Sequence, residues 1–223
     1  MTTLDNAAPL STDSALRIAD LGLISYPDAL QIQTQCREDR LARRAPDTLL
    51  LLEHPPTITI GRSGNAAGLL SSTQELEARG FQVYPTERGG LVTYHGPGQL
   101  VGYVIIDLSE MGIGVHEFMR RLEQVVIDTL EPLGISACRL PGYTGVWVEN
   151  RKIAAFGVHI KRWITIHGLA LNVNPDLSHF QAIVPCGIDD KPVTSILAER
   201  GQAPSISEVK VALAENFSRI FLR

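Results

Sequence analysis

Three runs of strand-forming residues follow one another between Thr144 and Val173 with almost no chain between them. The runs cover 145–149, 152–161 and 163–172, and Asn150-Arg151 and the neighbourhood of Arg162 form the turns. Strands joined by so short a connection pair antiparallel, because a parallel pair needs a crossover of a dozen or more residues. The pattern therefore predicts a β-meander in this part of the chain.

Helix signals lie on both sides of this meander and are not spaced regularly between strands. Further strands are expected at 48–53, 57–60, 82–85, 91–95 and 99–108, and helices at 25–44, 72–79, 115–133 and 205–221. Ser25 and Ser205 are placed to cap two of these helices, and Gly80 closes the helix at 72–79. The order predicts an α+β fold with a mixed, mostly antiparallel sheet flanked by helices.

The composition is that of an ordinary globular chain of 223 residues, with 44% hydrophobic and 20% charged residues. We expect residues 1–14 to form a flexible polar tail and residues 15–223 to form one domain. A net charge of −4 argues against a general binder of nucleic acid or of membrane surfaces. No apolar run reaches the roughly 18 residues of a membrane helix, and no secretion signal is visible.

Cysteine and histidine spacing excludes several site types. Cys36, Cys138 and Cys186 are an odd, widely spaced set without a Cys-x-x-Cys pair, so neither a disulfide framework nor a zinc site is indicated. No histidine pair has the spacing of metal ligands. These observations favour a cytoplasmic protein without a metal.

The run Arg88-Gly-Gly-Leu-Val-Thr-Tyr-His-Gly-Pro-Gly-Gln99 is a candidate ligand loop. Its glycines allow the backbone to approach a ligand closely, at an entropic cost that a plain connection rarely bears. The alternative is a wide hairpin or β-bulge in which the glycines only turn the chain. The run matches neither the phosphate loop of nucleoside triphosphatases nor the Rossmann glycine pattern.

Cys186 is a candidate nucleophile, because Pro185 and Gly187 bend the chain on either side of it. The alternative is a buried structural cysteine, as most free cysteines are. A thiol with a pKa near ~8.5 needs a base or a cationic neighbour at neutral pH. His95, His167 and Lys152 are the available partners.

Lys152 begins a strand on which Ala154, Phe156 and Val158 share its face. Partial burial would lower the pKa of its ammonium, and a facing thiolate would raise it again, so the pair could exchange one proton. The alternative is a lysine at a hairpin corner with its amine in water.

Five segments together resemble the family of lipoyl(octanoyl) transferases. They are Arg88 to Gln99 as above, Lys152-Ile-Ala-Ala-Phe-Gly-Val, His167-Gly-Leu-Ala-Leu-Asn-Val, Phe180-Gln-Ala-Ile-Val-Pro-Cys-Gly-Ile and Val193-Thr-Ser. The resemblance implies a fold similar to the catalytic domains of biotin and lipoate protein ligases, with a catalytic dyad of Cys186 and Lys152. It also implies a substrate-binding set made of Arg88, Gly89, Gly90, Leu91, Val92, Thr93, Tyr94, His95, Ala155, Phe156, Gly157, His167, Gly168, Leu169 and Ala170.

The implied reaction moves an octanoyl group from octanoyl-acyl carrier protein to a lysine of a lipoyl domain through an acyl-enzyme on Cys186. The implied acceptors are the lipoyl domains of 2-oxoacid dehydrogenase complexes and the H protein of glycine cleavage. No cofactor is expected, because exchange of one thioester for another is nearly balanced. Leu91, Phe156 and Leu169 are candidate walls for the alkyl chain.

Three other functions remain compatible with the residues. An ATP-dependent lipoate or biotin protein ligase would load free octanoate and need no cysteine. A Cys–His thioesterase would pair Cys186 with His95 or His167 and release free octanoate. A non-catalytic module would bind the carrier protein without a covalent change.

Overall fold

The main body of the protein is a seven-stranded sheet. In this computed structural model, residues 8–11, 15–65, 68–183 and 191–222 are described. The strands are β1 (Ala8–Ser11), β2 (Leu16–Leu23), β3 (Asp47–Glu53), β7 (Gln99–Ile105), β8 (Val146–Val148), β9 (Arg151–Lys161) and β10 (Ile164–Asn172). Their order is β1-β2-β3-β7-β10-β9-β8, and only the β2–β3 pair is parallel.

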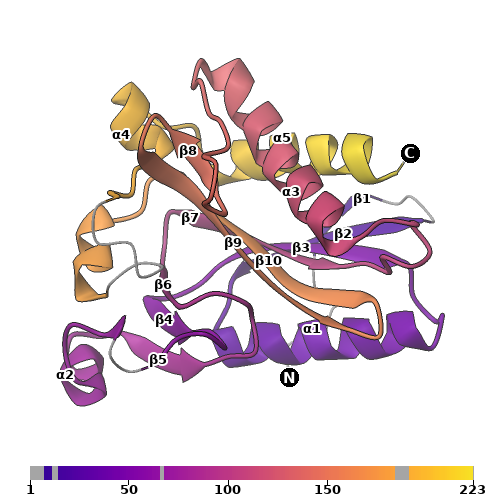
Figure 1. Cartoon of the computed structure of the whole chain (residues 1–223), viewed down its shortest axis with the longest axis horizontal. Coiled ribbons are helices and arrows are strands. Elements are labelled where there is room, and N and C mark those ends of the chain that lie inside the picture. Colours follow the sequence, from indigo (N-terminus) through magenta and orange to yellow (C-terminus); the bar gives the residue numbers. More distant parts are fainter. Residues whose placement is uncertain (1–7, 12–14, 66–67, 184–190, 223) are drawn as a thin grey trace.

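A second, three-stranded sheet lies beside the first, at the lower left of Figure 1. It has the order β5-β4-β6, from β4 (Thr57–Ile60), β5 (Gln82–Pro85) and β6 (Val92–His95). The short helix α2 (Thr73–Ala78) precedes β5, and Ser72 and Glu75 cap it reciprocally. This small sheet packs with the 3₁₀ helix η4 (Leu177–Ala182) in a hydrophobic cluster of its own.

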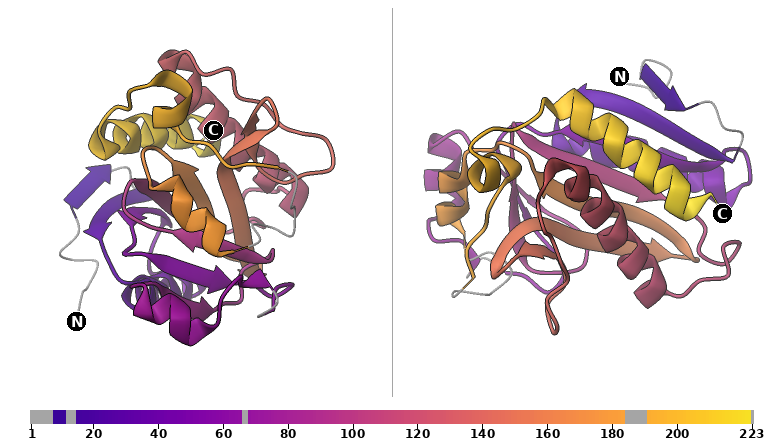
Figure 2. Two further views of the ribbon diagram at one scale, coloured as in Figure 1. Left: turned by 90° about the vertical axis from the view of Figure 1, so that its left-hand side faces the viewer. Right: turned by 90° about the horizontal axis from the view of Figure 1, so that it is seen from above.

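Helices cover both faces of the main sheet, as the views in Figure 2 show. On one face lie α3 (Val115–Leu130), which continues into η3 (Glu131–Leu133), and α5 (Ile206–Phe221). On the other face lies α1 (Tyr26–Leu41). A short helix, α4 (Ile196–Arg200), precedes α5. Burial of side chains such as Phe118, Leu122 and Phe217 against the strands supplies the main stabilising free energy.

The predicted α+β class and the mixed, mostly antiparallel sheet are confirmed. The meander is present as β8–β9–β10, and β9 and β10 pair in register from Lys161 and Ile164 inward. Helix α1 ends at Leu41, three residues earlier than expected. Its N-cap is Ser25, whose hydroxyl accepts a hydrogen bond from the Asp28 backbone N–H.

Two features of the first 23 residues differ from expectation. Strand β2 was not anticipated, and its partner β3 follows it only after the whole of α1. Residues 8–11 were expected to belong to a flexible tail, but they form β1 and pair with β2. The tail prediction is wrong for these four residues, because main-chain hydrogen bonds to an edge strand do not require an apolar sequence. The rest of that predicted tail lies outside the described residues.

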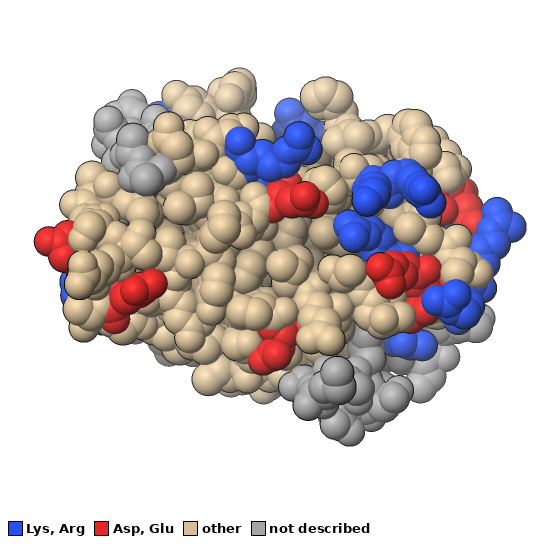
Figure 3. Space-filling model, turned by 90° about the horizontal axis from the view of Figure 1, so that it is seen from below, with Lys and Arg blue, Asp and Glu red and all other residues tan. Residues whose placement is uncertain are grey.

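Charged side chains are unevenly spread on the face seen from below (Figure 3). Arginine, lysine and acidic groups gather toward the right of this view, where both signs lie side by side, and the remainder of the face carries few charges. Such mixing produces no extended potential of one sign. Within the described ranges, no helix combines the length and the apolar composition needed to cross a membrane.

Candidate active site

A narrow cavity of about 50 Å³ lies where the small sheet meets β7, β9 and β10. Its walls are mainly apolar, which suits an alkyl chain. The residues that line it are Tyr26, Thr59, Arg88, Gly90, Leu91, Thr93, His95, Tyr103, Ala155, Phe156, Gly157, His167, Gly168, Leu169 and Ala170. Twelve of the fifteen residues expected to bind substrate are in this set.

The three expected residues that do not line the cavity are Gly89, Val92 and Tyr94. Successive residues of a strand point to opposite faces, so Thr93 and His95 of β6 face the cavity while Val92 and Tyr94 face away. Val92 and Tyr94 are instead buried in the cluster of the small sheet. The hydroxyl of Tyr94 lies 2.7 Å from Nδ1 of His179.

Arg88 fastens the glycine-rich loop to the small sheet. Its guanidinium donates to the Thr59 carbonyl at 2.7 Å, to the Thr59 hydroxyl at 2.9 Å and to the Leu91 carbonyl at 3.0 Å. The next residue, Gly89, donates its backbone N–H to Val158 of β9 at 2.9 Å. The loop thus bridges the two sheets and forms one wall of the cavity.

Two glycines permit the close backbone contacts around this wall. A Cβ on Gly157 would lie 2.9 Å from the Gly89 carbonyl oxygen and 3.2 Å from Cδ of Arg88. A Cβ on Gly168 would lie 2.2 Å from the carbonyl oxygen of Gly102. Neither position has room for a side chain, so the cavity depends on glycine there.

Lys152 is buried, with 8% of its surface exposed. Its ammonium lies 4.7 Å from the centre of the Trp147 ring, a distance typical of cation–π contact. Gly145 leaves space for it, because a Cβ there would lie 3.2 Å from Cε of Lys152. The alternative of a hairpin lysine with its amine in water is therefore wrong.

Lys152 lines a smaller cavity of about 20 Å³ that adjoins the first. The two cavities share Thr93, Ala155 and Ala170 as walls. The other residues around the smaller cavity are Gln99, Ala154, Asn172, Phe180 and Val193. The lysine thus lines a cavity that is separated from the larger one by shared walls only.

Cys186 lies outside the described residues, as do Pro185 and Gly187. The described chain on each side of this segment is held by main-chain pairing. Ile183 forms a bridge with Leu69, and Val193 forms one with Lys152 itself. The Lys152 N–H donates to the Pro192 carbonyl and the Thr194 N–H to the Lys152 carbonyl, both at 2.9 Å.

Three histidines near the cavity are buried and neutral. Burial lowers the pKa of His95 to about 3 and the pKa of His54 to about 4. Burial and, to a smaller extent, the charge of Arg88 lower the pKa of His167 to about 3. His54 donates from Nδ1 to the Ile24 carbonyl and lies 2.8 Å from the Tyr103 hydroxyl.

His167 also has an unusual backbone for a residue in a strand. Its φ is +61°, a conformation that non-glycine residues adopt rarely and at an energetic cost. Its N–H donates to the side-chain carbonyl of Gln33 at 2.8 Å. Gln33 is fully buried on α1, and its Nε2 has no hydrogen-bond partner among the described residues.

Sequence reasoning missed the contributions of residues distant from the glycine-rich loop. Tyr26, Thr59 and Tyr103 line the cavity but belong to α1, β4 and β7. Gln33 reaches His167 across 134 positions of sequence. The local sequence around Gln33 gives no sign of this contact, because only the packing of α1 on the sheet brings it there.

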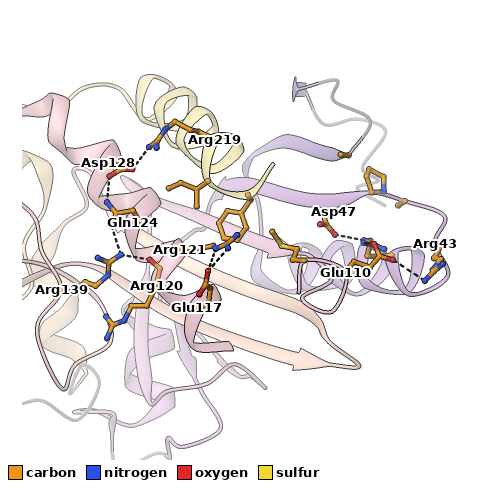
Figure 4. A pocket seen from close by; sticks show the side chains of 17 residues that line it. Arg43, Asp47, Glu110, Glu117, Arg120, Arg121, Gln124, Asp128, Arg139 and Arg219 are labelled. Carbon is orange, nitrogen blue, oxygen red and sulfur yellow. Dashed lines mark hydrogen bonds and ion pairs between the residues drawn. The ribbon is translucent and has the colours of Figure 1, made fainter. Parts of the chain in front are cut away.

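A far larger groove, of about 1080 Å³, lies on the side of α3 and α5 and is shown in Figure 4. Many of its charged side chains form ion pairs with one another. Arg121 binds Glu117, Arg219 binds Asp128, and Arg40 binds both Asp47 and Glu110. Since none of the residues expected to bind substrate lines this groove, we assign the site to the smaller, apolar cavity.

A family model described as the lipoyl protein ligase A/B catalytic domain matches residues 25–218. The chain is also 53% identical over 204 residues to a protein of Solibacter usitatus named octanoyltransferase, covering 92% of each chain. The match therefore spans the described cavity and Lys152 together.

Solved structures share the fold at much lower sequence identity. A structure of a bipartite lipoate protein ligase and its E2 lipoyl domain from Thermoplasma acidophilum has a TM-score of 0.67 at 20% identity, covering 94% of this chain and 84% of that one. The biotin protein ligase of Aquifex aeolicus has a TM-score of 0.53 at 15% identity, covering 94% and 70%. At such identities the likeness establishes the architecture alone.

Proposed function

Because the chain belongs to the family of lipoyl protein ligase A/B catalytic domains, we propose that it is an octanoyltransferase of protein lipoylation. It takes an octanoyl group from an acyl carrier protein thioester and joins it to the side-chain amine of a lysine on a lipoyl domain. Residues 15–223 act as one catalytic domain. The cavity beside β9 and β10 receives the alkyl chain, with Leu91, Phe156 and Leu169 among its apolar walls.

The observation that carries this proposal is the position of Lys152. The side chain of Lys152 is buried in a small cavity and is largely shielded from water. A lysine in such a place is suited to exchange a proton with a neighbouring thiol. Residues 192–194 follow Cys186 closely in the sequence, and they pair with the backbone of Lys152. This pairing supports a role for Cys186 and Lys152 as neighbouring catalytic groups.

In the first step, the Cys186 thiolate attacks the carbonyl carbon of the carrier thioester. A new carbon–sulfur bond forms to Sγ, and the bond to the carrier thiol breaks. Lys152 receives the proton of Cys186 and passes it to the departing thiolate, so that the carrier leaves as a thiol.

In the second step, the neutral amine of the acceptor lysine attacks the octanoyl-cysteine. The carbon–nitrogen bond of the amide forms and the carbon–Sγ bond breaks. One amine proton passes through Lys152 to Sγ, which returns Cys186 to the thiol. No nucleotide is consumed, because the donor is already a thioester.

We also propose a specific donor and specific acceptors for the octanoyl group. The donor is octanoyl-acyl carrier protein, and the acceptors are lipoyl domains of 2-oxoacid dehydrogenase complexes and the glycine cleavage H protein. The presence of an E2 lipoyl domain with the Thermoplasma ligase supports an acceptor of this class. The widely spaced cysteines support a reducing, cytoplasmic setting.

The buried histidines argue against a Cys–His thioesterase. A histidine that activates a thiol must take its proton and become charged, and burial opposes a charged imidazole at both His95 and His167. A lysine is a stronger base than a histidine, with an ordinary pKa of about 10.4 against about 6.5, so it is the better partner for a cysteine thiol.

Intact mass spectrometry tests the proposal directly. We expect the protein to gain one octanoyl group when mixed with octanoyl-acyl carrier protein, and to lose it when an apo lipoyl domain is added. Cys186→Ala should form no adduct, and Cys138→Ala, which removes an exposed thiol, should form it normally. Lys152→Met should slow both steps by roughly 10²–10⁴-fold.

Three results would contradict the proposal. Loading of free octanoate only in the presence of ATP would indicate a ligase. Release of free octanoate without a lipoyl domain would indicate a thioesterase. An octanoyl group on Cys138 in the wild-type protein would remove Cys186 from its assigned role.

A further inference from the structure

Two buried side-chain amides connect His95 to the segment beside Lys152. Gln99 is the first residue of β7, and Asn172 is the last residue of β10, directly opposite it in the sheet. Both are almost fully buried. Nε2 of Gln99 donates to Oδ1 of Asn172 at 2.9 Å, and both residues line the small cavity with Lys152.

Backbone carbonyls fix the orientation of both amides. Nδ2 of Asn172 donates to the Thr194 carbonyl at 2.9 Å, and a carbonyl can only accept. The Asn172 oxygen therefore faces Gln99. Nε2 of Gln99 also donates to the Tyr94 carbonyl at 3.2 Å, so the Gln99 oxygen faces the imidazole of His95.

This arrangement determines which nitrogen of His95 carries the proton. Nδ1 lies 2.7 Å from Oε1 of Gln99, which can only accept, so Nδ1 must be the donor. The second nitrogen, Nε2, then has a free lone pair. It has no hydrogen-bond partner in the part of the chain that the structure describes, and the ring lines the acyl cavity.

The surroundings of His95 oppose a second proton on the ring. The rings of His54 and His95 lie 5.8 Å apart, and Arg88 and His167 line the same cavity. A charged imidazolium here would be desolvated and would face these basic groups. His95 is thus held as a neutral ring that can accept a hydrogen bond but has little tendency to take up a proton.

We infer that Gln99 and Asn172 are positioning residues that hold Nε2 of His95 as a hydrogen-bond acceptor for the attacking amine. The inference rests on the proposed function, because the acceptor lysine supplies the N–H group. A primary amine has two such hydrogens: one leaves through Lys152 as the amide forms, and the other stays on the nitrogen. The hydrogen that stays donates to His95, which directs the nitrogen lone pair at the carbonyl carbon, and His95 itself exchanges no proton.

Separate measurement of the two half-reactions tests this role. Gln99→Leu removes the oxygen that accepts from Nδ1 of His95 and the nitrogen that donates to Asn172. It changes the side-chain volume little. We expect it to slow discharge of the preformed octanoyl-enzyme by about tenfold, the equivalent of one well-placed hydrogen bond. Formation of the octanoyl-enzyme should be slowed clearly less than its discharge, because no amine takes part in that step.

Nitrogen NMR of histidine-labelled protein tests the arrangement without reference to activity. His95 should be neutral with its proton on Nδ1 between about pH 6 and pH 8, across the range where an ordinary histidine titrates. His95→Gln identifies the signals by their loss. In Gln99→Leu the ring proton of His95 should no longer be confined to Nδ1. Thr129→Val, which removes a buried hydroxyl on α3, is the matched control and should change neither readout.

Each of the following results would overturn the inference. They are a proton on Nε2 in the wild type, a charged imidazole at neutral pH, unchanged discharge in Gln99→Leu, or equal slowing of both half-reactions. Failure of the proposed function has a different signature, since the wild-type protein would then form no octanoyl-enzyme whatever the state of His95.

Discussion

At the scale of single residues, the absence of side chains shapes the cavity as much as their presence does. Gly168 of β10 pairs with Tyr103 of β7, and the neighbouring Gly102 carbonyl comes so close that no Cβ fits at position 168. Gly157 similarly admits the carbonyl of Gly89. Glycine in a strand is normally unfavourable, so these residues trade local stability for close backbone packing around the cavity.

Gly168→Ala should destabilise the protein by about 3 kcal/mol, at the upper end of overpacking costs, because the new methyl meets backbone rather than a movable side chain. Gly102→Ala is the control in the same part of the sheet, where the nearest atom is Cγ of Leu169 at 3.2 Å. Urea unfolding should give a clearly smaller loss for this control. Equal losses would contradict the assigned contact.

Much of the site was accessible from sequence because its residues form contiguous runs. Thr93 and His95 lie on one strand, and Ala155 and Gly157 lie on another. Recognising each strand therefore identified both of its site residues. Gln99 and Asn172 fell within recognised segments, but nothing local distinguishes an amide that orients a histidine from one exposed to water. That distinction depends on the Thr194 carbonyl, which the fold brings from another part of the chain.

At the scale of elements, locally encoded features were predicted well and nonlocal ones were not. The caps at Ser25 and Ser205 were identified because cap and helix are adjacent in sequence. Strand β2 was missed because its parallel pairing with β3 forms only after α1 has crossed the sheet. No short window of sequence contains that information.

Helix α3 offers a test at this scale. Its N-cap is Gly114, which makes no side-chain hydrogen bond, has an extended backbone and has open space around it. Gly114→Ser should stabilise the protein by about 0.5–1 kcal/mol, by adding a cap and restricting the unfolded chain. We expect a rise in Tm of about 1–4 °C. Gly114→Ala, which cannot cap, should gain less, and a larger gain for alanine would contradict this account.

At the scale of the whole molecule, burial of several neutral histidines makes stability depend on pH. The pKa values of His54, His95 and His167 are lowered to about 4, 3 and 3 by burial. In the unfolded chain these groups titrate near pH 6.5. Below that pH the unfolded state binds more protons than the folded state, so stability falls as the pH falls toward 4.

Lowering the pH from 7.5 to 5.5 should therefore cost about 1 kcal/mol for each of the three histidines. The urea midpoint of unfolding is the measurement. Acidic groups with lowered pKa, such as Glu199 and Asp176, act in the same direction but only at lower pH. His116→Gln, at an exposed position, is the control and should leave the difference unchanged. Identical midpoints at the two pH values would contradict the prediction.

Main-chain hydrogen bonds join the strand that carries Lys152 to the segment 192–194. Main-chain hydrogen bonds do not depend on which side chains are present. Most substitutions in either segment should therefore leave the distance between the two segments unchanged. Proline at position 194 is an exception, because it has no N–H to donate. Relatives could thus vary both partners widely in the course of evolution while the lysine kept the same neighbour.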